Sequence, residues 1–298
     1  MARILLSGAT GFLGWHLFRH LTAMGNEVFG TSNRPRNEAS LLYCDICDPL
    51  AVEAVFQQVQ PDIVIHCAAI SSVTSSVAQE YYRVNTVGTE NVVNSSLART
   101  GKIRFIFIST AGVYGNQETD RLHENLCPKP VHHYGMSKFC AEQIIKNYAD
   151  QLDYTIIRPF NIIGVGQSGE FIMPKLVTAF HERQPVVKLG NIQVFRDYID
   201  VSDACELIAR VTFNPAAVGE VCNLCTGKPV SIETLLNTLT DITGHEIKPE
   251  VDPAFVRKNE VWRLLGDTAK LSSLTGGAIN GMNLEQSLRR MLAARGNV

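Results

Sequence analysis

The 298-residue chain has no cluster of basic residues and no long apolar run. It carries 27 Lys and Arg against 29 Asp and Glu, which gives a formal net charge of -2. Counterion-driven nucleic-acid binding needs clustered positive charge, so this balance argues against a nucleic-acid surface. No uninterrupted apolar stretch of about 20 residues occurs, and the first residues lack the apolar core and cleavage site of a signal peptide. We therefore expect a cytoplasmic protein that binds neither nucleic acid nor membrane.

Cysteine is also too sparse for a convincing metal or disulfide framework. Two C-x-x-C pairs occur among the eight cysteines, Cys44 with Cys47 and Cys222 with Cys225. Both pairs lie at predicted strand ends, where side chains three positions apart point to opposite faces and cannot share a metal ion. We expect no metal site, and mostly buried thiols that stay reduced.

Short β-branched runs alternate with amphipathic stretches through the first 160 residues. The runs cover 3–8, 27–32, 62–69, 103–110 and 154–161, and the amphipathic stretches cover 12–25, 49–59, 77–99 and 134–151. This alternation predicts an α/β fold, with helices on both faces of a parallel sheet. Beyond residue 160, Gly- and Pro-rich loops separate helical patterns near 172–183, 203–213, 231–243 and 284–294, which indicates a smaller second lobe.

The stretch "LLSGATGFLG" places Gly8, Gly11 and Gly14 at the turn from the first predicted strand into the first predicted helix. Glycines there let the backbone approach a pyrophosphate, and the helix N-terminus supplies amides and partial positive charge. A tight turn without a ligand is the alternative. Because the triplet opens a βαβ unit, it favours a dinucleotide site.

The end of the second predicted strand lacks an acidic residue. An acidic side chain there would accept both ribose hydroxyls of NAD and repel a 2′-phosphate. The sequence "GTSNRPRNE" instead offers Ser32, Asn33 and Arg34, which suit a phosphate and predict NADP(H). A solvated loop arginine is the alternative for Arg34. Asp45 and Ile46 follow the predicted strand end at Cys44 and are expected to flank the adenine. Asp45 is also typical of a simple turn.

In "HHYGMSK", Tyr134 precedes Lys138 by four residues, which places both side chains on one helix face. A free phenol titrates near pH 10, and a neighbouring ammonium favours the phenolate. We expect Lys138 to bring the pKa of Tyr134 toward neutrality and to make it a usable proton donor. Lys138 could also hold the nicotinamide ribose. The Tyr-x-x-x-Lys spacing is common by chance, but the glycine turn and "STAGVYG" at 109–115 favour this interpretation.

Six stretches together resemble the successive signatures of the extended short-chain dehydrogenase/reductase family, in that family's order. They are "GATGFLG", "HCAA" (66–69), "VNTVGTENV" (84–92), "FISTAGVYG" (107–115), "YGMSK" and "RPFNIIGVGQ" (158–167). The resemblance implies a Rossmann domain, a doubly wound parallel sheet, at 1–160 with a return segment at about 194–224. It also implies a smaller C-terminal α/β lobe at 161–193 and 225–298 that holds a nucleotide-sugar.

The resemblance assigns roles to individual residues. Thr110 would hydrogen-bond the reacting oxygen beside Tyr134, Asn85 would brace the active-site helix, and Ser109 would line the nicotinamide. Ordinary strand-end and helix polarity is the alternative for Thr110 and Asn85. The expected catalytic residues are Thr110, Tyr134 and Lys138. The expected cofactor residues are Gly8, Gly11, Phe12, Leu13, Gly14, Ser32, Asn33, Arg34, Asp45, Ile46, Cys67, Ala68, Ala69, Asn85, Ser109, Tyr134, Lys138, Arg158 and Pro159.

Arg196 is the best candidate for the substrate diphosphate, because guanidinium and phosphate match bidentately. A salt bridge to Asp197 or Asp200 is the alternative. Arg257 and Glu260 could present a cation to phosphate and a carboxylate to ribose or guanine, or could form a solvated pair. The expected substrate residues are Ser71, Ser72, Thr110, Asn161, Arg196, Arg257 and Glu260.

Ala111 and Gly112 follow Thr110, and neither can remove the C5 proton that a 4,6-dehydratase must take. Epimerases of the family usually retain NAD, whereas the non-acidic "TSNR" indicates a dissociable NADPH and net reduction. Several stretches most resemble the family's reductases of GDP-4-keto-6-deoxy-D-mannose, which form GDP-D-rhamnose. Two departures are His133, where relatives often carry Pro, and "TGGAIN", where they carry Thr-Gly-Trp.

Several alternatives remain open. The chain could form the other C4 epimer, use a CDP-, UDP- or dTDP-sugar, or reduce a small hydroxy-ketone. It could be a nucleotide-sugar 4-epimerase or a non-catalytic NADP-sensing regulator. Helices near 77–98 and 134–150 carry apolar stripes on more than one face, and relatives pack these helices into a four-helix bundle. We expect a homodimer, with an intramolecular core as the alternative for those positions.

Overall fold

A seven-stranded, fully parallel sheet forms the larger part of the computed structural model, which describes residues 1–71, 77–256, 260–277 and 281–296. The strand order is β10-β6-β5-β4-β1-β2-β3, so the chain reverses direction across the sheet between β1 and β4. The strands are β1 (Arg3–Ser7), β2 (Glu27–Ser32), β3 (Leu41–Tyr43), β4 (Ile63–His66), β5 (Arg104–Ile108), β6 (Asp153–Pro159) and β10 (Val221–Leu224). This arrangement confirms the predicted doubly wound α/β fold.

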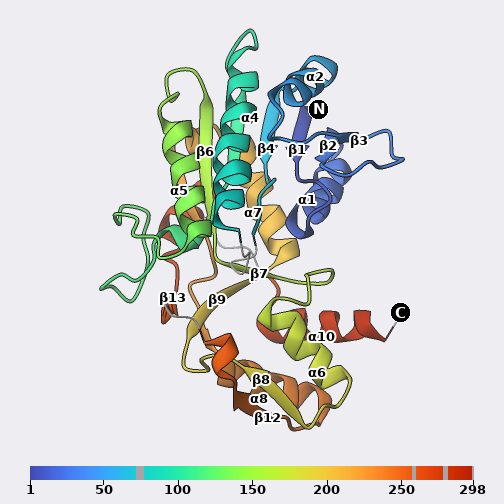
Figure 1. Ribbon diagram of the computed structural model, residues 1–298, viewed down its shortest axis with the longest axis vertical. Coiled ribbons are helices and arrows are strands. Elements are labelled where there is room, and N and C mark those ends of the chain that lie inside the picture. Colours follow the sequence, from blue (N-terminus) through green and yellow to red (C-terminus); the bar gives the residue numbers. More distant parts are fainter. Residues whose placement is uncertain (72–76, 257–259, 278–280, 297–298) are drawn as a thin grey trace.

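Helices cover both faces of this sheet (Figure 1). One face packs against α2 (Pro49–Val59), α4 (Gly88–Leu97) and α5 (His133–Lys146). The other packs against α1 (Phe12–Ala23), α7 (Val201–Phe213) and α9 (Ala269–Thr275). Central strands such as β4 and β5 are buried along almost their whole length, as expected of a sheet with two covered faces.

The helix predicted at 77–99 is interrupted. It consists of α3 (Ala78–Tyr82), a π-helical turn (Arg83–Val87) and α4. A π-helical turn inserts one residue into the hydrogen-bond ladder and shifts the side chains that follow, and such turns are frequent at functional sites. Short 3-10 turns occur at Ala111–Val113, Pro215–Ala217 and Pro253–Phe255.

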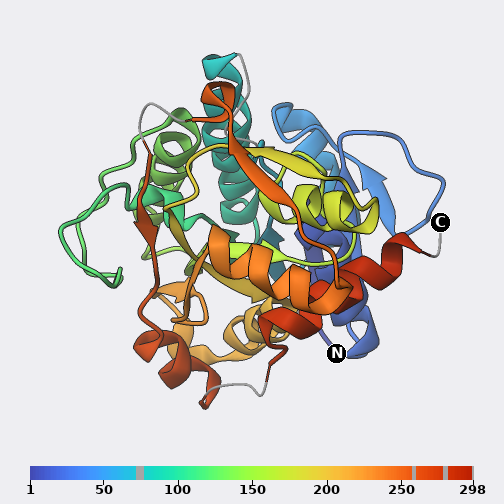
Figure 2. The ribbon, with the colours of Figure 1, turned by 90° about the horizontal axis from the view of Figure 1, so that it is seen from below.

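The second lobe lies below the C-terminal edge of the large sheet in Figure 1, and Figure 2 shows its helices side by side across the lower end of the molecule. Strand β9 (Phe195–Asp200) pairs with β7 (Asn161–Ile163), β11 (Pro229–Ser231) and β13 (Arg263–Leu264), and β8 (Val186–Leu189) pairs with β12 (Lys248–Val251). The helices α6 (Ile172–His181), α8 (Ile232–Thr243) and α10 (Leu284–Arg295) share an apolar core with β8.

The predicted division into domains stays a prediction. Within the return segment expected at about 194–224, α7 and β10 lie with the large sheet, whereas β9 at its start pairs with strands of the second lobe. None of the helices in the described residues is long and apolar enough to cross a membrane.

All eight cysteines are free thiols, and their exposure varies more than predicted. Four are buried, Cys44, Cys205, Cys222 and Cys225, whereas Cys127 and Cys140 are exposed. Burial raises the pKa of the buried thiols, to about 11 for Cys44 and to about 12 for Cys205.

Candidate active site

The glycine turn between β1 and α1 is too tight for other residues. Gly8 has φ +69°, and a Cβ there would lie 2.8 Å from the Ala68 backbone, while a Cβ at Gly14 would lie 2.1 Å from the Gly8 carbonyl oxygen. Gly11 occupies the N-cap of α1, where no described side chain caps the helix. The first amides of α1 are therefore available to an anion, as a pyrophosphate site requires.

A buried hydrogen-bond chain connects this turn to the neighbouring helices. The Ala68 amide donates to Ser7 Oγ (3.1 Å), Ser7 Oγ lies 2.6 Å from His66 Nδ1, and His66 Nε2 lies 2.9 Å from Thr89 Oγ1. Because the Thr89 hydroxyl donates to the Asn85 carbonyl (2.7 Å), it accepts from His66 Nε2. Burial lowers the pKa of His66 to about 3, so the imidazole is neutral and accepts from Ser7.

Asn85 links the loop after β4 to α5. Its side chain exchanges two hydrogen bonds with the Ile70 backbone (2.8 and 3.1 Å) and donates to Ser137 Oγ (3.1 Å). Ser137 Oγ in turn donates to the Tyr134 carbonyl (2.9 Å). These contacts agree with the bracing role expected of Asn85. Ser137, His66 and Thr89 were not singled out from the sequence, because their partners lie in distant segments.

Thr110 and Tyr134 meet at the C-terminal end of β5. The Thr110 hydroxyl accepts from the Gly112 amide (3.0 Å), and its interaction with the Tyr134 phenol lowers the pKa of that phenol. Burial has the larger effect and raises the pKa of Tyr134 to about 12. The expectation that Lys138 brings this pKa toward neutrality is therefore wrong for this structure, since desolvation of the phenolate outweighs the hydrogen bond from Thr110, and Lys138 is not among the groups that shift the pKa.

Lys138 is 1% exposed, one helical turn after Tyr134. Its Nζ lies 4.0 Å from the centroid of the Phe107 ring and has no hydrogen-bond partner among the described residues. Burial lowers the pKa of Lys138 to about 7, although Cys67 and Glu142 oppose the shift. A buried amine without acceptors is costly, so this position fits a ligand that brings hydroxyl oxygens. Together with the glycine turn, it fits the ribose of a nicotinamide cofactor.

A buried ion pair lies one turn further along α5. Arg158 donates to both oxygens of Glu142 (3.0 and 2.6 Å), and Ser109 Oγ donates to Glu142 Oε1 (2.5 Å). The guanidinium also stacks over the Tyr114 ring, with Cζ 4.8 Å from its centroid. Glu142 was not predicted, and it engages the side chains of Ser109 and Arg158. The cofactor contacts expected of those two residues stay predictions.

The residues expected around the adenosine lie together at the ends of β2 and β3. Ser32 is buried and its hydroxyl accepts from the Arg34 amide (3.1 Å), whereas Asn33 and Arg34 are exposed. Asp45 accepts from the Cys47 amide (2.9 Å), which is the turn geometry given as its alternative. Ile46 is buried.

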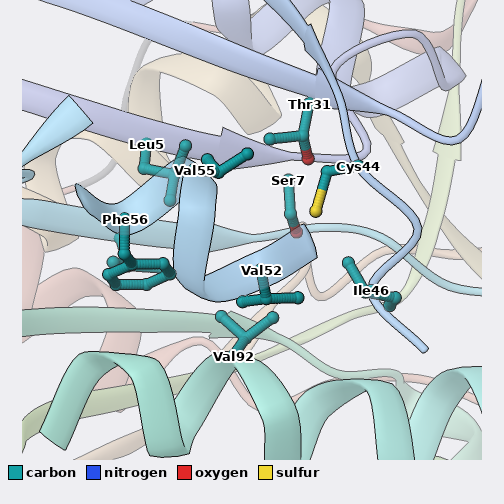
Figure 3. A pocket seen from close by; sticks show the side chains of 10 residues that line it. Leu5, Ser7, Thr31, Cys44, Ile46, Val52, Val55, Phe56 and Val92 are labelled. Atoms are coloured by element: carbon teal, nitrogen blue, oxygen red, sulfur yellow. The ribbon is translucent and has the colours of Figure 1, made fainter. Parts of the chain in front are cut away.

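Behind Ile46 lies a gap of about 10 Å³ between the sheet and α2 (Figure 3). Figure 3 shows Leu5, Val52, Val55, Phe56 and Val92 closing around it, with the hydroxyls of Ser7 and Thr31 on one side. A gap of this size holds at most one water molecule, so it is a packing defect and not a ligand site.

On the substrate side, the structure brings Arg196 and Glu260 together. Arg196 Nη2 lies 3.1 Å from Glu260 Oε1, its Nη1 donates to the Val261 carbonyl (2.7 Å), and the two side chains are only 14% and 11% exposed. Both carboxylates given as alternative partners have other contacts: Asp197 accepts from the Thr226 and Gly227 amides (both 2.8 Å), and Asp200 accepts from the Ser202 amide (2.8 Å).

Two of the remaining predicted substrate residues, Asn161 and Ser71, lie in the described part of the chain. Asn161 donates to the Asp197 carbonyl (3.1 Å), next to Arg196, and Ser71 is exposed after β4. Ser72 and Arg257 lie outside the described residues. No group of three or more potential metal ligands occurs in the part of the chain that the structure describes.

Comparison with known proteins places this geometry in a family. The NAD-dependent epimerase/dehydratase family matches residues 4–225. GDP-6-deoxy-D-talose 4-dehydrogenase of Aggregatibacter actinomycetemcomitans is 35% identical over 295 residues, covering 98% of both chains. GDP-6-deoxy-D-mannose reductase of Pseudomonas aeruginosa is 29% identical over 302 residues, covering 98% of this chain and 96% of the relative.

A solved structure agrees over the full length. RMD from Pseudomonas aeruginosa, complexed with NADPH, superimposes with a TM-score of 0.86 at 28% identity and covers 100% of both chains. The family match, the 35% identical relative and the shared fold lead to one conclusion: the chain belongs to the NAD-dependent epimerase/dehydratase family, as its extended short-chain dehydrogenase/reductase signatures predicted.

Proposed function

We propose that this protein uses NADPH to reduce the C4 ketone of a nucleoside-diphosphate 4-keto-6-deoxyhexose, with GDP-4-keto-6-deoxy-D-mannose as the preferred substrate. The observation that carries the proposal is the meeting of Thr110 and Tyr134 one helical turn before the Lys138 amine, which has no hydrogen-bond partner among the described residues, on a sheet that also carries the glycine turn. A proton donor, a hydroxyl beside it and a buried amine therefore lie close to a dinucleotide-type turn.

A bound NADP(H) would supply the hydride. The amides at the start of α1 bind the pyrophosphate, and the exposed Arg34, with Asn33, binds the 2′-phosphate. Lys138 donates to the nicotinamide ribose hydroxyls, which gives its buried amine the acceptors that no described residue provides. A relative at 28% identity holds NADPH, and another at 27% identity holds NAD, so the preference for NADP(H) rests on the non-acidic Ser32, Asn33 and Arg34.

Tyr134 acts as the proton donor. With its pKa raised to about 12 by burial, the phenol is fully protonated at neutral pH and can donate to the oxygen that develops at C4. Thr110, whose hydroxyl faces the phenol, hydrogen-bonds the same oxygen. A positioned general acid contributes about 10²- to 10⁴-fold to the rate. Dehydration is not favoured, because Ala111 and Gly112 provide no carboxylate beside Thr110.

The two relatives are named for GDP-linked 6-deoxytalose and 6-deoxymannose. 6-Deoxytalose and 6-deoxymannose differ only in configuration at C4, so oxidation of either sugar at C4 gives the same 4-ketone. A GDP-linked 4-keto-6-deoxymannose is therefore the substrate that both names indicate. We expect GDP-D-rhamnose as the product, and GDP-6-deoxy-D-talose is the second candidate, favoured by the 35% identical relative.

The Arg196–Glu260 pair and Asn161 are the proposed contacts to the nucleoside diphosphate. Glu260 holds the guanidinium in place at one nitrogen and the Val261 carbonyl holds it at another, so Arg196 is oriented before phosphate binds. We also expect a homodimer through α4 and α5, since Val87 and Met136 are exposed beside these helices.

One experiment separates the candidates. The purified protein is incubated with NADPH and each of the GDP-, UDP-, CDP- and dTDP-4-keto-6-deoxysugars, while NADPH absorbance is followed and the product is analysed by proton NMR. Oxidation that is fastest with the GDP-sugar supports the proposal, and the coupling between H3 and H4 identifies the C4 epimer. In a parallel incubation with nucleotide sugars that carry a C4 hydroxyl, interconversion of C4 epimers without net NADPH consumption would indicate an epimerase. NADPH binding without turnover of any sugar would indicate a regulator.

A further inference from the structure

His132, two residues before Tyr134, occupies the N-cap of α5. Its backbone is extended (φ −143°, ψ 157°), and its Nδ1 accepts a hydrogen bond from the Gly135 amide (3.0 Å). The imidazole also stacks on the Tyr134 ring, with centroids 6.1 Å apart and planes inclined by 20°. The His132 side chain therefore caps the first turn of α5 and packs against one face of the Tyr134 ring, the proposed proton donor.

The same imidazole also contacts the turn that carries Thr110. A Cβ at Gly112 would lie 3.2 Å from His132 Cε1, and a Cβ at Gly135 would lie at the same distance. The Gly112 amide is bonded to the Thr110 hydroxyl (3.0 Å). Glycine at these two positions leaves the space that the ring fills, so His132 is wedged between the Thr110 turn and the first turn of α5.

We infer that His132 is a positioning residue whose neutral imidazole holds Tyr134 in register with Thr110, and that its protonation releases this alignment. The part of this inference that concerns turnover rests on the proposed function. The cap exists only while Nδ1 carries no proton, because a protonated nitrogen cannot accept from the Gly135 amide. A positive charge at the N-terminus of α5 would also oppose the helix dipole.

Among the described residues, the groups packed against His132 include the Tyr134 phenol on α5, which in turn packs against Tyr81 of α3 with ring centroids 6.4 Å apart. On its other side the imidazole packs against the Gly112 backbone, whose amide donates to the Thr110 hydroxyl. An imidazole ordinarily titrates near pH 6.5, so release of the cap should occur at mildly acidic pH.

Three variants test this inference. His132→Asn keeps an N-cap acceptor that does not titrate, and His132→Ala removes the cap. His133→Asn is the matched control, because His133 is exposed and its Nδ1 lies 3.0 Å from Tyr82 Oη of α3. Hydrogen exchange at the first amides of α5 is measured from pH 5 to 8 and divided by the intrinsic rate at each pH. Steady-state kinetics with NADPH and the 4-keto sugar are measured over the same range.

We expect amide protection and kcat of the native protein to fall together below about pH 6.5. His132→Ala should show low protection and about tenfold lower kcat at every pH, about 1.4 kcal/mol, with an unchanged NADPH dissociation constant. His132→Asn should restore kcat at neutral pH and remove the acid loss, and His133→Asn should keep the native profile.

The inference is overturned if His132→Ala keeps native protection at Gly135, or if His132→Asn retains the acid loss of protection. Should His132→Ala not fold, the comparison of His132→Asn with the native protein over pH still decides, because Asn keeps the cap without a titrating group. Exchange needs no substrate, so failure of the proposed reaction leaves this test intact. If the proposed reaction is confirmed but kcat is the same in the His132 variants, the positioning role is rejected and the proposed function is not.

Discussion

The burial of the Glu142–Arg158 pair determines how much the free energy of unfolding should fall when one partner is removed. The two side chains are 0% and 2% exposed and share two hydrogen bonds of 3.0 and 2.6 Å. Arg158→Met leaves the Glu142 carboxylate buried, with the Ser109 hydroxyl as its one hydrogen-bond donor among the described side chains. Breaking a buried pair by removing one partner costs about 3–5 kcal/mol, because an uncompensated charge remains in the interior. We expect a loss of this size in the free energy of unfolding.

Two further variants show whether charge is the cause. Glu142→Leu combined with Arg158→Met removes both charges, and an apolar replacement of a buried pair is often close to neutral, so most of the stability should return. Arg289→Met breaks the exposed pair with Glu285, whose side chains are 56% and 51% exposed, and should cost less than about 1 kcal/mol. Reversible urea unfolding gives the three values. A loss below 1 kcal/mol for Arg158→Met, or a double variant no more stable than Arg158→Met, would refute the reasoning.

Three other predictions concern the cofactor. Arg34→Ala should weaken NADPH binding about tenfold and leave NADH binding unchanged in fluorescence titrations, since only NADPH brings a charged phosphate; equal losses would assign Arg34 a structural role. Because the pKa of Lys138 is lowered to about 7, much of the amine is neutral at pH 8, and ribose acceptors that raise this pKa should cause net proton uptake on NADPH binding. Calorimetry in buffers of different ionisation enthalpy should show this uptake fading below pH 7, and Lys138→Met should show none. Gly8→Ala should lower stability and NADPH affinity more than Gly25→Ala, because both have positive φ but only the Gly8 Cβ meets backbone atoms; equal stability losses in thermal unfolding would contradict this.

The sequence was most informative where a residue pattern depends on its immediate neighbours. Buried parallel strands are continuous apolar runs, so five of the seven strands of the large sheet were located to within a few residues, whereas β3 and β10 were given no range. The helix α9 was not predicted, because seven residues are too few to show a helical period. The π-helical turn at Arg83–Val87 was not predicted either, since an inserted residue leaves no signal in apolar spacing.

The same distinction holds for the active site, where relations between residues close in sequence were predicted and pairings of distant residues were not. Tyr134 and Lys138 lie on one helix, so their spacing alone predicted that they face the same region. Arg196 and Glu260 are 64 residues apart, and only the fold shows that they pair with each other. The pKa of Tyr134 was predicted in the wrong direction, because the sequence shows the neighbouring charge but not the burial that opposes it. The cap formed by His132 was not predicted for a related reason, since histidine is not among the usual N-cap residues.

The central claim is that Tyr134 delivers the proton in an NADPH-dependent reduction. Its most direct test is the rate of NADPH oxidation by Tyr134→Phe with GDP-4-keto-6-deoxy-D-mannose, measured beside the NADPH dissociation constant of the same variant. The account predicts a kcat lower by about 10²- to 10⁴-fold and an NADPH dissociation constant within twofold of the native value. A kcat close to the native value would contradict it.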